Sequence, residues 1–340
     1  MTLPINKKIT GTILVIHPKF IGDAVNNTTA ISLLRELYPN NKIIVLVNPL
    51  LAPIFKRDDR FNLTVMIDER HDKKQKKSIF YQAKKIKEHN VQLAIIMKSA
   101  FSDALLCTLA NIKYKIGYKK NGRSWLLSHK YKINNNHHYI NRYCRLVNEP
   151  HNQPFTTSPS TYVFSKRSKL IKADRNKPTI AVYYGGLVKK YRHYPSSQAF
   201  QSLALINQTL PSHFVLVGDN QEITDNAKIS TDLIENSIDF QDLTGKTTLT
   251  ELVDIIASVD LLITIDSGAM HIAAATKTAF VAVVGLGTSP WSIVEPKCEN
   301  KISLVANGSS LNDAEIIKEI SPEKIVEAAF SLLKNKITFL

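Results

Sequence analysis

The feature that most constrains the fold of this 340-residue chain is its alternation of short apolar runs with amphipathic stretches. Apolar runs bounded by turn residues are typical of strands buried in a parallel sheet, and the stretches between them are typical of the helices that cover it. The pattern therefore predicts an α/β fold made of βαβ units. Strands are predicted at residues 11–17, 42–48, 92–98, 179–185, 213–219, 261–266 and 279–285.

Helical periodicity occupies the intervals between these strands. Helices are predicted at residues 24–37, 78–90, from about 102, and at 196–208, 220–228, 247–259, 268–277 and 321–335. The last has Ser321 as N-cap and Pro322 in the first helical position, which is a good helix start. After Pro150 the alternation lapses into a segment rich in Pro, Ser, Thr and Asn, and then resumes. Two doubly wound domains are the simplest architecture.

The net charge of +15 is distributed unevenly. Residues 1–150 contain 26 Lys and Arg against 10 Asp and Glu, whereas residues 151–340 contain 18 against 19. The basic half, with its densest runs from Lys73 and from Ile112, is expected to attract an anionic membrane, a phosphorylated glycolipid or nucleic acid. Each lysine run also fits an ordinary solvated face. We expect no nucleic-acid partner, because the chain has no recognisable RNA- or DNA-binding motif.

Several classes of protein do not fit the sequence. The first residues lack a secretory signal pattern, and the longest apolar tract, 252–286, is interrupted by charged residues and does not span a membrane. Cys107, Cys144 and Cys298 are widely spaced without metal-ligand spacing, so we expect packing residues in a reduced cytoplasm. No DxD pair or His-carboxylate cluster indicates a metal.

A polar turn follows the predicted strand at 261–266. Asp266, Ser267 and Gly268 stand between that strand and a helix that carries His271. Small residues let a ligand approach the backbone closely, and the first N–H groups of a helix favour a phosphate. The turn therefore predicts an anion-binding loop, although a capped βα turn would have the same sequence.

Several segments together resemble glycosyltransferase family 9, the ADP-heptose:lipopolysaccharide heptosyltransferases, over nearly the whole chain. They are ILVIHPKFIGDAVNNTTAISLLRELYPNNKI, YYGGLVKKYRHYPSSQAFQSLA, FVLVGDNQE, LTGKTTLTEL and DLLITIDSGAMHIAAATKTAFVAVVG, in the family's order. The resemblance implies the GT-B fold, in which two Rossmann-like domains face a central cleft. It divides the chain into a basic acceptor-binding domain (1–160), a linker (161–176), a nucleotide-sugar-binding domain (177–320) and a C-terminal helix (321–340) that could pack back on the first domain.

The chain departs from the family pattern at three places. Arg192 stands where the family commonly has Lys, Thr29 where it commonly has Pro, and Lys19-Phe20 where small polar residues precede Gly22-Asp23. Arg also binds phosphate, often with two hydrogen bonds, so phosphate binding is still expected. Acceptor choice is less constrained.

Sugar transfer requires a base for the acceptor hydroxyl and positive charge for the departing diphosphate. The resemblance assigns Asp23 as the base, where the residue alone fits equally well an N-cap of the 24–37 helix. It assigns Arg192 and the N–H groups of residues 267–269 to the diphosphate. Further donor-site residues are expected at Gly185, Gly186, Lys189, Lys190, Glu222, Leu243, Thr244, Gly245, Lys246, Asp266, Ser267, Gly268, Ala269 and His271.

For these residues the resemblance implies finer roles. Asp266 would hold a sugar hydroxyl, or only cap its turn. Glu222 would bind the ribose, or be a solvated carboxylate, and the 243–246 segment would lie along the adenosine, or be a plain turn. His271 would order the loop. On the acceptor side we expect Gly22, Lys19, Lys120 and Arg123.

The implied function is inverting, metal-independent transfer of heptose from ADP-heptose to the inner core of lipopolysaccharide, without a cofactor, at the cytoplasmic face of the inner membrane. Two alternatives are open. One is a related transferase with another acceptor, such as a protein hydroxyl or another glycan, or another nucleotide sugar. The other is a non-catalytic nucleotide-binding protein that docks on an anionic surface.

Overall fold

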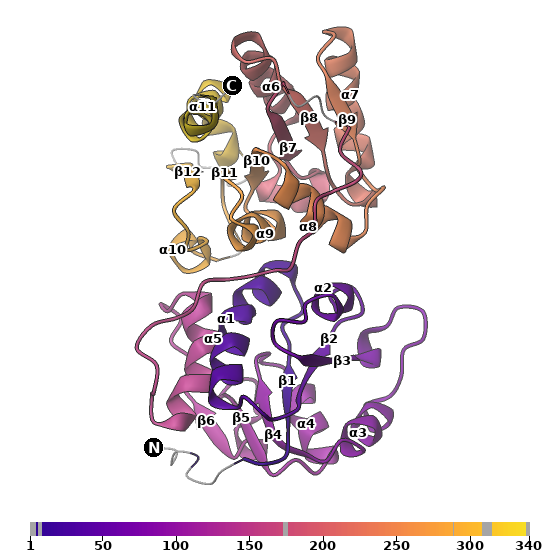
Figure 1. Ribbon diagram of the computed structural model, residues 1–340, viewed down its shortest axis with the longest axis vertical. Coiled ribbons are helices and arrows are strands. Elements are labelled where there is room, and N and C mark those ends of the chain that lie inside the picture. The colour runs from indigo at the N-terminus through magenta and orange to yellow at the C-terminus, as the bar shows by residue number, and fades with distance from the viewer. Residues whose placement is uncertain (1–4, 6–8, 173–175, 288, 308–314, 338–340) are drawn as a thin grey trace. The chain divides into compact units, whose positions relative to one another are not determined.

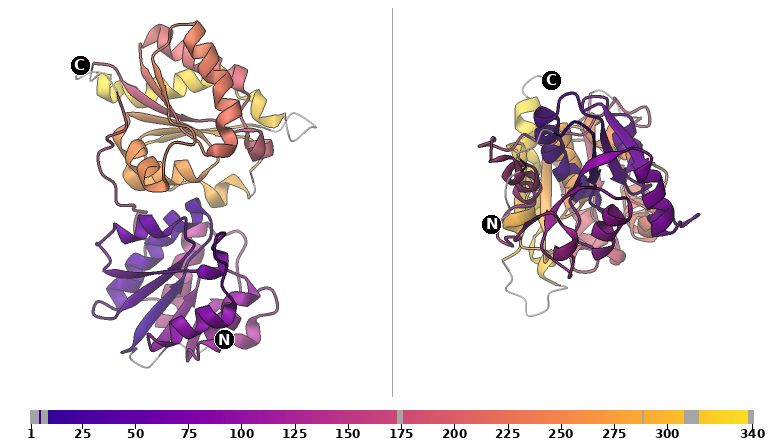
Figure 2. Two further views of the ribbon diagram at one scale, coloured as in Figure 1. Left: turned by 90° about the vertical axis from the view of Figure 1, so that its right-hand side faces the viewer. Right: turned by 90° about the horizontal axis from the view of Figure 1, so that it is seen from below.

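The chain forms two compact units, Met1–Phe164 and Ser165–Leu340. The computed structural model describes residues 5, 9–172, 176–287, 289–307 and 315–337. Each unit is built around one six-stranded sheet in which every neighbouring pair of strands is parallel. In both units helices cover the two faces of the sheet (Figures 1 and 2).

The sheet of the first unit has the strand order β3-β2-β1-β4-β5-β6. Its strands are β1 (Thr12–Ile16), β2 (Ile43–Val47), β3 (Leu63–Ile67), β4 (Val91–Ile96), β5 (Tyr114–Tyr118) and β6 (His129–Tyr131). Its helices are α1 (Ile21–Leu37), α2 (Ala52–Lys56), α3 (Ile79–Lys87), α4 (Phe101–Leu109) and α5 (Tyr139–Asn148), with 3-10 turns η1 (Glu69–His71), η2 (Ser124–Leu126) and η3 (Glu149–His151).

The sheet of the second unit has the order β12-β11-β10-β7-β8-β9, which is the same topology repeated. Its strands are β7 (Thr179–Tyr183), β8 (His213–Leu216), β9 (Phe240–Asp242), β10 (Leu261–Ile265), β11 (Phe280–Val284) and β12 (Lys301–Val305). Its helices are α6 (Ser196–Thr209), α7 (Ile223–Glu235), α8 (Leu249–Ser258), α9 (Gly268–Thr276), α10 (Trp291–Val294) and α11 (Pro322–Ile337), with 3-10 turns η4 (Leu187–Arg192), η5 (Asn220–Glu222) and η6 (Ile316–Glu319).

In each unit the strand order reverses between two central strands, β1 and β4 in the first and β7 and β10 in the second. In open α/β sheets ligands bind at the carboxyl ends of the strands at this reversal, because the two following loops diverge to opposite faces and leave a crevice. The fold therefore directs attention to the loops after these four strands.

All seven predicted strands are present, and the α/β class is confirmed. The prediction missed β3, β5, β6, β9 and β12. Four of these are edge strands, whose residues are mostly half-exposed, so they lack the continuous apolar run of a buried strand. The prediction also missed α5 and ended the helix after residue 220 too early, since α7 continues to Glu235.

The C-terminal helix α11 packs on α6 and on strands β10, β11 and β12. Its apolar face is therefore covered within the second unit, where the sequence had left open a return to the first domain. The described part of 152–178 contains no helix or strand. Among the residues that the structure describes, no helix has the length and apolar character needed to cross a membrane.

Candidate functional site

The predicted donor-binding segments all follow the carboxyl ends of four adjacent strands. Residues 184–186 follow β7, residues 217–219 follow β8, residues 243–246 follow β9, and residues 266–267 follow β10. Because these strands are neighbours in the order β10-β7-β8-β9, segments spread over about a quarter of the chain meet at one edge of the second sheet. We refer to these four segments as the donor edge.

Glu222, three residues after the donor-edge segment that follows β8, is almost completely buried. It is 1% exposed, and its Oε1 accepts a hydrogen bond from the Tyr183 hydroxyl at 2.6 Å and lies 3.2 Å from Lys189 Nζ. Its Oε2 accepts the backbone N–H of Asp219 at 2.9 Å in a capping box. The alternative of a solvated carboxylate is therefore wrong. Glu222 joins the loops after β7 and β8, and burial together with the Glu222 charge raises the pKa of Tyr183.

The two glycines after β7 are required by their surroundings. Gly185 has φ +67, and a Cβ on Gly186 would lie 2.5 Å from Asp225 Oδ2. That carboxylate oxygen accepts the Leu187 N–H at 2.9 Å and so holds the start of η4. Within η4, Lys190 has φ +52, an unfavourable conformation for a residue with a side chain. Strain of this kind is concentrated at binding loops, and the Lys190 side chain is exposed.

Arg192 links the two sides of the strand-order reversal. Its Nη1 donates to the backbone carbonyl of Asp266 at 2.9 Å, so the loop after β7 is tied to the loop after β10. A guanidinium has five N–H donors and this bond uses one. The Asp266 side chain is 9% exposed, and burial raises its pKa although the Arg192 charge opposes the shift.

Helix α9 begins at Gly268, two residues after Asp266. Ser267 is its N-cap, and the Ser267 hydroxyl accepts the Ala269 N–H at 3.1 Å. That N–H is therefore engaged within the protein, which makes Ala269 less suited to bind an anion through its backbone than the preceding Gly268. His271 is 7% exposed in the first turns of α9, as fits a residue that orders the loop.

The 243–246 segment forms a tight turn against the loop after β8. Gly245 has φ +70 and donates its N–H to the Gly218 carbonyl at 2.9 Å. The Thr244 hydroxyl accepts from Asn226 Nδ2 at 2.7 Å, and Lys246 Nζ donates to the Asp242 carbonyl at 2.8 Å. Leu243 and Thr244 are buried, while Gly245 and Lys246 are exposed and face solvent.

In the first unit, Asp23 lies just beyond the carboxyl end of β1, at the reversal between β1 and β4. Helix α1 begins at Ile21 with Phe20 as N-cap, so the alternative of Asp23 as N-cap is wrong. Its carboxylate is half-buried and accepts a hydrogen bond from the Tyr143 hydroxyl. Burial raises the pKa of Asp23, and the Tyr143 bond and the Arg142 charge oppose that shift.

The sequence did not identify Tyr143 and Arg142, because it did not predict α5. A helical signal was present, since Ile140, Tyr143, Cys144 and Val147 repeat at helical spacing. In the structure α5 packs along α1, and the Cys144 thiol lies 3.3 Å from the Thr29 hydroxyl. This packing fixes Tyr143 beside Asp23.

The residues expected on the acceptor side differ in exposure. Lys19 and Lys120 are exposed, with Lys19 Nζ 5.8 Å from the centre of the Phe20 ring, and Gly22 is half-buried in the first turn of α1. Arg123 is fully buried. It donates from Nε to the Tyr118 carbonyl at 3.0 Å and from Nη1 to the Ala100 carbonyl at 3.4 Å. The expectation of a direct acceptor contact therefore does not fit Arg123, which braces two loops instead.

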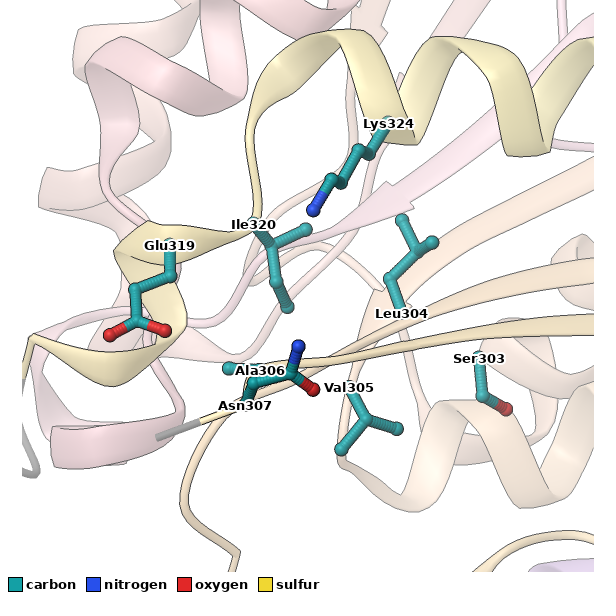
Figure 3. A pocket seen from close by; sticks show the side chains of 8 residues that line it. All are labelled: Ser303, Leu304, Val305, Ala306, Asn307, Glu319, Ile320 and Lys324. Atoms are coloured by element: carbon teal, nitrogen blue, oxygen red, sulfur yellow. The ribbon is translucent and has the colours of Figure 1, made fainter. Parts of the chain in front are cut away.

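A cavity of about 270 Å³ lies between the carboxyl end of β12 and α11 (Figure 3). It contains none of the predicted donor residues. Its lining residues are Ser303, Leu304, Val305, Ala306, Asn307, Glu319, Ile320 and Lys324. Across the described ranges no group of three His, Cys, Asp or Glu is arranged to hold a metal ion.

Two parallel sheets of this order, one with glycine-rich loops and a helix N-terminus at its reversal point, define an α/β protein of two doubly wound units. A model of glycosyltransferase family 9 (heptosyltransferase) matches residues 79–315. Because the match covers well over half of the chain, the protein belongs to glycosyltransferase family 9 and is a transferase.

Individual proteins agree with this assignment. The chain is 24% identical to lipooligosaccharide heptosyltransferase 2 of Haemophilus ducreyi, over 94% of this chain and 99% of that protein. A solved Escherichia coli ADP-heptose lipopolysaccharide heptosyltransferase II has a TM-score of 0.80 at 20% identity, covering 96% of this chain and 99% of that one. An E. coli heptosyltransferase with ADP-2-deoxy-2-fluoro heptose has a TM-score of 0.68 at 15% identity, covering 94% and 99%. The expected GT-B class of fold is confirmed.

Proposed function

We propose that this protein transfers heptose from ADP-heptose to the inner core of lipopolysaccharide, with inversion of the anomeric centre and without a metal ion. The proposal rests on the donor edge, where four predicted nucleotide-binding segments meet at one edge of the second sheet. The chain that carries them belongs to the heptosyltransferase family. The names of its relatives, and the ADP-sugar analogue in one solved structure of this fold, support the choice of donor and acceptor.

The reaction needs little machinery beyond the residues described. Asp23 takes the proton of the acceptor hydroxyl, whose oxygen attacks the anomeric carbon as the bond to the diphosphate breaks. A single displacement of this kind inverts the anomeric centre, by the logic that applies to inverting glycosidases. Arg192 and the Gly268 end of α9 compensate the charge of the departing diphosphate, which is the role that a divalent cation would otherwise fill.

The direct test is transfer by the full-length protein with a panel of nucleotide sugars, with and without EDTA, and with the product anomer determined by NMR. We expect ADP-heptose to be used in preference to uridine and guanosine diphosphate sugars, no loss with EDTA, and an inverted product. Preference for another nucleotide would overturn the donor assignment, and a retained anomer would overturn the role of Asp23.

Replacing Arg192 by Ala is expected to weaken the binding of ADP and of ADP-heptose together, because the diphosphate is common to both. A charge-assisted hydrogen bond contributes about 1.5 to 3 kcal/mol, so a loss of about 10- to 100-fold is expected by calorimetry. Arg167→Ala is the matched control, because it also removes an arginine of the second unit, and the Arg167 side chain is exposed. Its neighbour Ser168 donates its backbone N–H to the Ser258 hydroxyl in the last turn of α8, so Arg167 does not belong to the donor edge. Unchanged ADP affinity in the Arg192 variant would transfer the role to Lys189 or Lys190.

The basic first unit is proposed to dock the enzyme on the anionic cytoplasmic face of the inner membrane, where its lipid-linked acceptor is embedded. Replacing Lys73, Lys74, Lys76 and Lys77 by Gln is expected to lower binding to anionic liposomes and to raise the KM for embedded acceptor. Each surface lysine contributes up to about 1 kcal/mol to such binding, and less at high salt.

The control for this prediction carries the same change of charge in the second unit. It replaces four of the exposed lysines of that unit, Lys228, Lys297, Lys318 and Lys334, and should leave liposome binding unchanged. The lysines from Lys113 to Lys132 are neutralised in a parallel variant. If neither first-unit variant binds liposomes less tightly at low salt, the membrane proposal fails and a soluble acceptor becomes the better hypothesis.

A further inference from the structure

Two large aromatic side chains lie exposed beside each other in the first unit. Trp125 is 73% exposed and Phe101 is 39% exposed, and their ring centres are 6.3 Å apart with an angle of 50° between the planes. Exposed single apolar residues are common on proteins, but a tryptophan this open next to a phenylalanine forms an apolar surface that water solvates poorly. We refer to Phe101 and Trp125 as the aromatic pair.

The backbone around the pair is held firmly although the rings are exposed. Phe101 begins α4, directly after the loop that follows β4, and Trp125 lies in η2 between β5 and β6. The buried Arg123 side chain bonds to the carbonyls of Tyr118 and Ala100, and so joins the two connections. Next to Trp125, Leu126 is 5% exposed and anchors η2 in the core.

A second bond ties the turn before η2 to the same loop. Asn121 Nδ2 donates to the Ser99 carbonyl at 3.0 Å. The pair is therefore presented by two braced loops, and little conformational entropy remains to be lost when a ligand packs on it.

The surroundings of the pair are cationic. Lys119 and Lys120 are exposed on the turn that Asn121 fastens. Lys98, in the loop before Phe101, is already paired with the buried carboxylate of Asp68 at 3.5 Å, so the unburied positive charge near the pair comes from Lys119 and Lys120. A flat apolar surface beside ammonium groups matches a sugar that has C–H groups on one face of its ring and a carboxylate or phosphate at its edge.

The position in the fold favours a substrate over a lipid surface. β4 is the strand next to β1 at the strand-order reversal, and the connection after β1 carries Asp23. The pair therefore lies beside the loop after β4, one strand away from the loop that leads to the proposed base, at the edge of the sheet where doubly wound domains bind ligands. By contrast, the exposed Phe80 on α3 is followed by Tyr81, whose ring lies near Lys77 and Lys85, an arrangement better suited to a membrane.

We propose that the aromatic pair is a subsite for one sugar ring of an acidic oligosaccharide acceptor, with Lys119 and Lys120 facing its anionic substituent. The inference rests on the proposed function and adds to it the residues that recognise the acceptor. Trp125 and Phe101 bind and orient the acceptor, and neither takes part in the chemical step.

The test uses the full-length protein and an acceptor oligosaccharide from which the lipid has been removed. Trp125→Ala and Phe101→Ala are each expected to raise the KM for this soluble acceptor about tenfold, in the range of a lost aromatic contact, with kcat and ADP affinity nearly unchanged. Trp125→Tyr keeps a ring and should restore most of the affinity. Phe80→Ala is the control, and it should leave this KM unchanged.

The outcomes separate this inference from the proposed function. Normal KM values in Trp125→Ala and Phe101→Ala, with a parent protein that transfers heptose, would overturn the subsite and leave the function intact. A defect only with acceptor embedded in anionic vesicles, accompanied by weaker vesicle binding, would also overturn it and identify the pair as a membrane contact. A parent that transfers no heptose to any core oligosaccharide would overturn the proposed function and the subsite together.

Discussion

Replacing Asp23 by Asn is expected to lower kcat by about 100- to 10,000-fold, the usual effect of removing a general base. Asn has nearly the same shape and can still accept a hydrogen bond from Tyr143, but it cannot take a proton. ADP affinity should be unchanged, because the proposed diphosphate ligands belong to the second unit. Steady-state kinetics with saturating acceptor and calorimetry with ADP measure the two quantities. Near-normal turnover would show that Asp23 has only a structural role in α1.

The pH dependence gives an independent check on Asp23. Only the carboxylate acts as a base, so activity should fall as the pH drops through the Asp23 pKa, which burial raises above its ordinary value. Tyr143→Phe removes a hydrogen bond that favours the carboxylate, and the acid limb of kcat/KM should therefore move to higher pH. A limb that stays in place in the Tyr143 variant would assign the limiting titration to another group.

Replacing Arg70 by Met is expected to lower the free energy of unfolding of the first unit by about 3–5 kcal/mol, because the change removes the guanidinium that two buried carboxylates share and leaves Asp68 only its longer contacts with Lys98 and His71. Arg70 Nη2 lies 2.8 Å from both Asp68 and Asp103, and the three side chains are 8%, 0% and 2% exposed. Urea unfolding followed by Trp125 fluorescence in a Trp291→Phe background measures the effect, since Trp125 belongs to the first unit.

The same variant has a defined pH dependence. Burial alone would raise the pKa of Asp68, but the hydrogen bonds and charge of Arg70 overcome burial and lower it. In the parent this stability is present above the unfolded pKa of about 3.9 and is lost as the pH falls through the folded value. Without Arg70 the Asp68 carboxylate can be protonated in acid, so the difference between parent and variant should be largest near pH 7 and shrink below about pH 4.

Lys85→Met is the control for Arg70, because it also removes a cation that pairs with a carboxylate, Glu69. The Lys85 side chain is 40% exposed, and pairs of this kind contribute at most about 1 kcal/mol. Equal losses in the Arg70 and Lys85 variants would mean that the buried network is no more important than a surface ion pair.

The sequence alone predicted the central strands of both sheets. β1, β2, β4, β7, β8, β10 and β11 are buried almost throughout, and a strand covered on both faces has a nearly continuous apolar run. β5 was not predicted from the sequence, because its Lys115 and Gly117 interrupt the apolar run. Local chemistry also predicted the turn at Ser267, whose capping hydroxyl and small neighbours are needed wherever a strand passes directly into a helix.

The partners of each site residue were decided by tertiary structure. Asp is a residue type that often caps helices, but helix α1 begins two residues before Asp23. The fold places the Asp23 carboxylate against Tyr143, which belongs to a helix far along the chain. Glu222 sits at a helix start like many solvated carboxylates, but neighbouring loops enclose it with Tyr183 and Lys189.

Arg123 shows most clearly that the local sequence does not predict whether a charged side chain is buried. It lies in a lysine-rich, polar stretch that predicts exposure, yet the fold buries it completely between two carbonyl groups. Apolar periodicity and turn chemistry are local properties, and so the sequence by itself determined the α/β class, the doubly wound units and the polar loops that follow their central strands. Burial of a charge depends on which donors and acceptors distant segments supply to it. Only the tertiary structure decided which polar residues of these loops are exposed and which hold the loops together.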